Sequence, residues 1–110
     1  MPLIADRVTH AVFAVRPENL VAAAGFWRTL GVAFEEFTRP DYGLRILFSW
    51  PHGVEIITWT EPIGAFGQQL LQFLETKGEG FYTLNYGVRD LDETVRRVND
   101  CGVVCRRLGN

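Results

Sequence analysis

The sequence of 110 residues predicts a single domain of the α+β class, with a βαβββ module followed by an incomplete second βαβ module. Two observations lead to this prediction. The order strand, turn, helix, Gly-Val occurs over residues 7–32 and again over residues 81–103. Three further apolar segments, separated by turn residues, follow only the first copy. A repeated strand-helix unit indicates two related halves, and the cleft between such halves is a natural place for a site.

The first copy begins with a β-branched, apolar strand over Val8–Val15, which Pro17 ends. A helix is predicted over Leu20–Leu30, because Glu18 and Asn19 offer a polar start and Gly31 suits a left-handed C-terminal cap. Its apolar residues recur at helical spacing and predict a buried stripe of Leu20, Ala23, Ala24, Trp27 and Leu30.

The next three segments predict an antiparallel meander that completes the first module over residues 1–60. Turn residues at 39–43 and 51–53 separate strands expected at Ala33–Thr38, Leu44–Trp50 and Val54–Trp59. Residues 61–80 are predicted to be a linker with a short helix over Gln69–Thr76.

The second module is expected over residues 81–110. A strand over Phe81–Val88 precedes Asp90, a plausible N-cap of a helix that stops at Gly102. Leu91, Val95 and Val98 are expected to form its buried stripe. Residues 103–108 have the composition to begin one more strand, but the sequence stops before a second meander.

Composition narrows the classes of function. The formal net charge is −2 and the basic residues are scattered, so nothing favours nucleic acid or an anionic membrane surface as partner. No segment has the pattern of a secretory signal or the length of a membrane span, which predicts a cytoplasmic protein. Cys101 and Cys105 do not have the spacing of a redox or zinc motif and are expected to be reduced thiols.

Four short motifs, in this order, resemble the vicinal oxygen chelate superfamily, which includes glyoxalase I, methylmalonyl-CoA epimerase, extradiol dioxygenases and bleomycin-resistance proteins. Residues 8–15 resemble its first strand, residues 25–32 the end of its first helix, and residues 53–57 its fourth strand. Residues 77–92 resemble the opening of its second module, in the epimerase branch. The resemblance implies that each module curves into half of a cup, a glyoxalase-like half-barrel.

The same resemblance implies a metal site. His10 matches the ligand of the first strand and Glu55 that of the fourth, where Glu55 would also be catalytic. Strand alternation agrees, since His10 shares its face with Val8, Val12 and Ala14, and Glu55 shares its face with Ile57 and Trp59. Imidazole with carboxylate suits zinc, iron, manganese, nickel or cobalt. The third ligand position falls on Thr83, a poor ligand, and the fourth lies beyond this sequence.

The candidate site residues can also be explained without any role in binding or catalysis. His10 could be a hydrogen-bonded histidine on an apolar strand face, and Glu55 could pair with Arg45 across the hairpin. His52 lies in a Pro-His-Gly turn and is expected to be solvated. Tyr82 is expected to face away from Thr83 by alternation.

Other side chains are candidates for binding a substrate. Asn85 follows Thr83 on the inward face, and Phe48 and Trp59 are the aromatic residues expected beside Glu55. The remaining aromatic residues of the first module are expected to be mostly core: Phe26, Trp27, Phe34, Phe37 and Trp50.

Three functions stay open. The first is a protein that binds a small oxygen-rich or acyl metabolite, as a metal-dependent isomerase, lyase or dioxygenase; a divalent ion in such a site stabilises an enolate or orients a diol. The second is a metal-free binding protein of the bleomycin-resistance type. The third is a truncated or decayed chain whose remaining role is association.

The incomplete second half predicts a homodimer, because the strand at residues 81–88 lacks neighbours and the second helix lacks a cover. In such a dimer, Thr83 and Asn85 of one subunit would face His10 and Glu55 of another.

Overall fold

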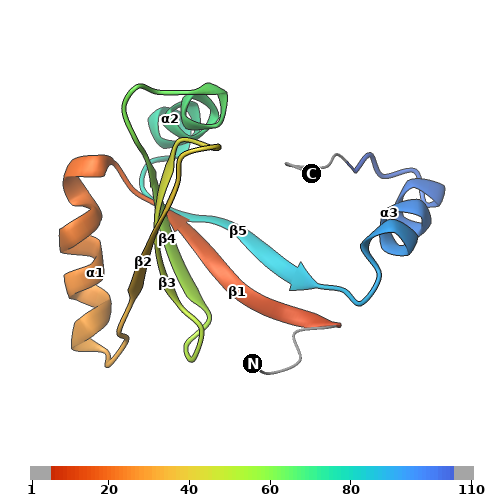
Figure 1. Cartoon of the computed structure of the whole chain (residues 1–110), viewed down its shortest axis with the longest axis horizontal. Coiled ribbons are helices and arrows are strands. Elements are labelled where there is room, and N and C mark those ends of the chain that lie inside the picture. Colours follow the sequence, from red (N-terminus) through yellow and green to blue (C-terminus); the bar gives the residue numbers. More distant parts are fainter. Residues whose placement is uncertain (1–5, 106–110) are drawn as a thin grey trace.

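The computed structural model describes residues 6–105 and shows an open five-stranded sheet with helices on it (Figure 1). The strand order is β2-β3-β4-β1-β5, and the sheet does not close into a barrel. The strands are β1 (Arg7–Ala14), β2 (Glu35–Arg39), β3 (Leu44–Ser49), β4 (Val54–Trp59) and β5 (Gly80–Gly87). The predicted α+β class is confirmed, with the expected βαβββ module followed by a partial second one.

The first module has the predicted meander. β2 pairs with β3 and β3 with β4, both antiparallel, while β4 returns to pair with β1 in parallel. The turn between β3 and β4 needs Gly53, whose φ is +64° and whose missing Cβ would lie 3.1 Å from the carbonyl oxygen of Thr9. This close approach sets β4 tightly beside the start of β1, where His10 lies.

One face of the sheet is covered by α1 (Leu20–Thr29), which follows a short 3-10 turn, η1 (Pro17–Asn19). Leu20 and Ala24 of α1 are buried against Leu47 and Ile56 of the sheet. The predicted stripe is wrong at its end: Leu30 lies past the helix and is 61% exposed. Three aromatic residues expected in the core are also exposed: Phe26, Phe37 and Trp50.

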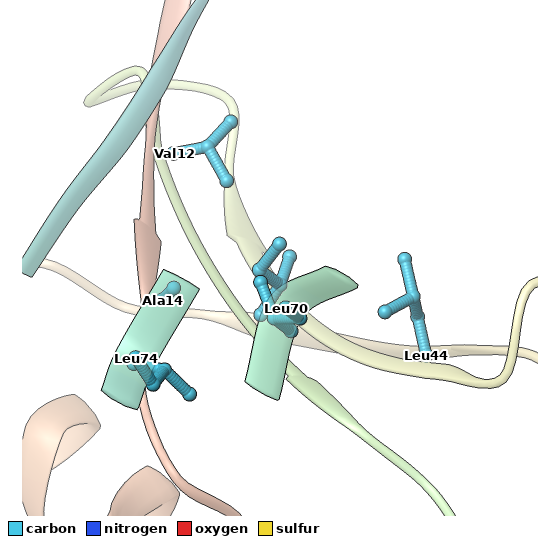
Figure 2. Close-up of a cluster of buried hydrophobic side chains, with 6 residues drawn as sticks. Val12, Ala14, Leu44, Leu70 and Leu74 are labelled. Atoms are coloured by element: carbon cyan, nitrogen blue, oxygen red, sulfur yellow. The ribbon is translucent and has the colours of Figure 1, made fainter. Parts of the chain in front are cut away.

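The opposite face is covered at one end by α2 (Ala65–Lys77), which is longer than the short helix predicted for the linker. Figure 2 shows Leu70 and Leu74 of α2 packed with Val12 and Ala14 of β1 and Leu44 of β3. The early Pro62 and Gly64 precede the helix, and the apolar spacing then continues through its whole length. α2 therefore covers one end of this face and leaves the other end open.

The second module is β5 followed by α3 (Leu91–Asp100), whose N-cap is Asp90 as predicted, with its side chain accepting a hydrogen bond from the Glu93 amide. The predicted burial of the apolar stripe is wrong, because α3 buries no residue and Leu91 is 54% exposed. In Figure 1, α3 lies beyond the end of β5, away from the sheet. Within residues 6–105, no strand follows α3 that could cover it.

Residues 103–105 are irregular, and the rest of the strand considered for residues 103–108 lies outside the described residues. Cys101 and Cys105 are free, as expected. No helix in the described part of the chain is long and apolar enough to cross a membrane.

β5 joins the sheet by pairing antiparallel with β1, and this pairing is irregular at two places. The register shifts between Val8 and His10, and again between Val12 and Phe13. A bulge of this kind lets consecutive side chains depart from strict alternation. Both bulges lie where the two modules meet.

Candidate functional site

The face that carries α2 contains a cleft of about 660 Å³, a volume typical of small-molecule sites. Val12, Leu44, Ile46 and Ile57 line it with apolar surface from the sheet. Polar groups reach it from three elements and a loop: Arg39 of β2, Tyr42, Gln69 of α2, and Glu55 of β4. Thr83 and Asn85 line it from β5. The site thus lies between the first module and the first strand of the second.

His10 and Glu55 meet beside this cleft, as the alternation of both strands predicts. His10 Nε2 lies 2.9 Å from Glu55 Oε1, and the two side chains are 9% and 15% exposed. Asn85 approaches the same nitrogen, with its Nδ2 atom 2.8 Å away. Two polar side chains, Glu55 of β4 and Asn85 of β5, therefore converge on a single atom of β1, His10 Nε2.

Burial is the main electrostatic influence on this cluster. It raises the pKa of the Glu55 carboxyl to about 7 and lowers the pKa of His10 below its usual value. Both shifts favour the neutral forms. A carboxyl with a pKa near neutrality can both give and take a proton at neutral pH, which is the property of a general acid-base group.

Neighbouring side chains fix the orientation of the imidazole. The ring of Phe48 meets it edge to face at a centroid distance of 4.6 Å, and Trp50 lies 6.2 Å away. The Thr9 hydroxyl lies 2.9 Å from His10 Nδ1 on the other side of the ring. His10 is therefore held on several sides before any ligand enters.

Several expectations need correction. Glu55 does not pair with Arg45, whose Nε lies 2.7 Å from Glu36 instead. Asn85 reaches His10 of its own chain, so this contact needs no second subunit.

The remaining candidates lie at different distances from the cluster. Thr83 lines the cleft, and Phe48 supports the ring of His10. Trp59 lies farther along β4, where it packs against the core under α2 and is not among the residues that line the cleft. The structure thus separates Trp59 from the other candidates.

Sequence reasoning missed four polar residues that line the cleft: Arg39, Tyr42, Gln69 and Tyr82. Arg39 and Tyr42 were treated only as turn residues; the Arg39 guanidinium stacks on the Tyr42 ring at 4.5 Å and pairs with Asp41 at 2.9 Å. Tyr82 lines the cleft and packs on Phe73 at 4.8 Å, although alternation placed it on the other face. The second bulge, which leaves Tyr82 without a partner on β1, is the reason. Gln69 lies in the helix that the sequence predicts, but nothing in the sequence indicates that it lines the cleft.

His10 and Glu55 supply two of the donors that a divalent cation needs. His10 Nε2 and Glu55 Oε1 lie 2.9 Å apart, so both donors would face one cation placed between them. The described residues contain no group of three or more His, Cys, Asp and Glu side chains suited to a metal. The Asn85 amide lies at the same atom and carries an oxygen that could serve as a further donor if the amide turned.

Solved structures with a similar arrangement of elements include methylmalonyl-CoA epimerases. A variant of the Streptomyces coelicolor enzyme with bound 2-nitronate-propionyl-CoA is 23% identical, with a TM-score of 0.70 over 90% of this chain and 74% of the other. An epimerase with methylmalonyl-CoA and NH4+ matches with a TM-score of 0.69 at 23% identity, over 90% of this chain and 72% of the other. The chain has the fold of a vicinal oxygen chelate protein.

The Mycobacterium tuberculosis methylmalonyl-CoA epimerase gives the same result, with 23% identity and a TM-score of 0.68 over 93% of this chain and 69% of the other. No protein-family model and no curated protein sequence matches the chain. The vicinal oxygen chelate fold predicted from four short motifs is thus confirmed by structure. At 23% sequence identity, this similarity supports a shared fold and not a shared function.

Proposed function

We propose that this vicinal oxygen chelate protein binds a small acyl thioester of the acyl-CoA type in the cleft and moves a proton at the carbon next to the carbonyl group. The carrying observation is the convergence of Glu55 and Asn85 on His10 Nε2 at the edge of a cleft lined by apolar side chains. The bound molecules of the structurally similar epimerases, 2-nitronate-propionyl-CoA and methylmalonyl-CoA, support the choice of ligand class.

Each part of the cleft has a role in this proposal. The apolar floor of Val12, Ile46 and Ile57 takes the acyl chain. Arg39, which lines the cleft from β2, attracts an anionic group of the ligand. Glu55 accepts the proton from the α carbon and returns it, and its pKa of about 7 suits both directions.

A divalent cation would be held by His10 Nε2 and Glu55 Oε1, with zinc, iron, manganese, nickel and cobalt all compatible with these donors. When bound, it would supply positive charge that stabilises a developing enolate oxygen. Asn85 and Thr83 would then orient the ligand's polar groups from β5.

The experiment is proton exchange at the α carbon of methylmalonyl-CoA in D2O, followed by NMR with and without added divalent metal. Wild-type protein is expected to exchange the proton, and Glu55→Gln to lose roughly 10²–10⁴-fold in rate, as the removal of a general base does. Glu36→Gln is the matched control, because Glu36 pairs with Arg45 and does not line the cleft. No exchange by the wild type under any metal condition contradicts the enzymatic proposal.

A metal-free binding protein is the second candidate. It is favoured by the contacts that the polar cluster already makes with itself: both ring nitrogens of His10 have side-chain partners within 2.9 Å. Saturable binding of an acyl thioester without exchange of its α proton would identify this function.

We also propose an oligomeric state and a location in the cell. One is a homodimer through the uncovered surface of β5 and α3, on which Leu84, Tyr86 and Leu91 are exposed. The other is a cytoplasmic location.

A further inference from the structure

The first bulge between β1 and β5 gives His10 an unusual neighbour. Val8 pairs with Tyr86 and His10 pairs with Asn85, so Thr9 has no partner residue on β5. In a regular strand the side chains of Thr9 and His10 would point to opposite faces. Here the bulge turns the Thr9 side chain so that its Oγ1 atom lies 2.9 Å from Nδ1 of the very next residue.

The hydroxyl of Thr9 has one hydrogen and lies near two groups that could accept it, His10 Nδ1 and the carbonyl oxygen of Asn85. Thr9 Oγ1 donates to the carbonyl oxygen of Asn85 at 3.1 Å, which is an acceptor with no hydrogen of its own. When the hydrogen lies on this contact, the same oxygen accepts at His10 Nδ1. In this arrangement Nδ1 carries the ring hydrogen, and in the neutral ring Nε2 carries the lone pair.

We propose that Thr9 is a positioning residue that fixes the Nδ1–H tautomer of His10 and so presents the Nε2 lone pair to the amide hydrogens of Asn85. Nε2 lies 2.8 Å from Asn85 Nδ2, which has hydrogens to donate to that lone pair. A lone pair at this atom is also what a metal ion requires of a histidine ligand, with the opposite ring nitrogen held by a neighbour.

The opposite tautomer would require several contacts to change at once. An Nε2–H group would face the Asn85 amide hydrogens, and a bare Nδ1 would draw the Thr9 hydrogen away from the Asn85 carbonyl. Each such lost hydrogen bond in a part-buried place is destabilising. Without the Thr9 hydroxyl, only Asn85 would favour the Nδ1–H form, and Glu55 would favour an Nε2–H donor.

The test is the tautomer itself, read from the ¹⁵N chemical shifts of the imidazole nitrogens in histidine-labelled, metal-free protein at about pH 8, where an ordinary imidazole is neutral. The sequence has two histidines, and His52→Gln assigns the signals. Wild type and Thr9→Ser, which keeps the hydroxyl, are expected to show a protonated Nδ1 and an unprotonated Nε2. Thr9→Val, which keeps the β-branched shape, is expected to shift the pattern toward Nε2–H.

Amide spectra of Thr9→Val verify that the variant is folded before the shifts are compared. A wild-type spectrum with a protonated Nε2, or a Thr9→Val spectrum with the wild-type nitrogen shifts, overturns the proposal. If Thr9→Val does not fold, the Thr9→Ser and wild-type spectra still test the proposal, because a protonated Nε2 in either one overturns it. The measurement uses no ligand and no turnover, so its outcome is separate from that of the proposed function.

Discussion

Single residues give the cleft its chemistry, and Glu55 is the residue on which most of the proposal depends. Its carboxyl group lies among Val12, Ile57 and the imidazole of His10, with little access to water. Removing a carboxylate from water raises its pKa unless a cation compensates. His10, whose own pKa is lowered by burial, does not provide a full positive charge. Ionisation of Glu55 is therefore less favourable in the folded protein than in the unfolded chain.

This gives a prediction for the pH dependence of stability in metal-free protein. The folded-state pKa of Glu55, about 7, is above its value of 4.5 in the unfolded chain, so the folded form binds more protons between these values and its stability falls as pH rises through them. Glu55→Gln mimics the protonated form. It should match wild type at pH ~5 and exceed it by about 1–3 kcal/mol at pH ~8. Denaturant unfolding at both pH values measures the difference; a difference that does not change with pH contradicts the assignment.

At the scale of elements, α2 forms one wall of the cleft and packs closely on the sheet. Gly67 of α2 is buried, and a Cβ built on it would lie 2.7 Å from Ile63 Cγ1 and 3.1 Å from Trp59 Cβ. Gly25 of α1 is the opposite case, because nothing lies within 4 Å of its Cβ position. The same substitution should therefore have opposite effects in the two helices.

We expect Gly67→Ala to lower the free energy of unfolding by about 1–2 kcal/mol, since overpacking outweighs the better helix propensity of alanine. Gly25→Ala should raise it by about 0.5–1 kcal/mol. Thermal and denaturant unfolding of the two variants give the comparison. Stabilisation by both substitutions would show that α2 does not sit as close to Trp59 and Ile63 as described.

The sequence predicts those elements and contacts that depend on interactions between residues close together in the chain. The strands of the first module, the pair of His10 and Glu55, and the N-cap at Asp90 follow from alternation and capping, which are local. The two bulges depend on how β1 meets β5, which no local pattern records. Tyr82 in the cleft and Thr9 beside the imidazole were missed for that reason.

The whole molecule consists of a well-packed first module and a thinly covered second one. β5 lies at the edge of the sheet, and Phe81, Leu84 and Tyr86 are each more than half exposed on it. α3 adds an amphipathic helix that buries no residue. Unpaired edge strands with apolar side chains are commonly covered by another chain. The homodimer expected from the sequence is consistent with this surface and is still a prediction.

Light scattering coupled to size exclusion should give twice the mass of one chain. Leu84→Lys, which places a charge on the exposed side of β5, should shift the protein toward the monomer. Lys77→Glu, at the end of α2, is a charge-changing control outside β5 and α3. A wild-type monomer at all concentrations would contradict the predicted dimer. It would not contradict the proposed cleft, which one chain forms by itself.

The central claim is that the cleft of a single chain binds an acyl thioester next to His10 and Glu55. Titration of ¹⁵N-labelled protein with methylmalonyl-CoA, followed by amide spectra, tests it most directly. We predict saturable shifts at Thr83 and Asn85 of β5 and at Arg39 of β2, and none in α1 on the opposite face. Glu55→Gln should still bind, because it keeps the shape of the cleft. Absence of saturable shifts, or shifts confined to α1 or α3, would contradict the account.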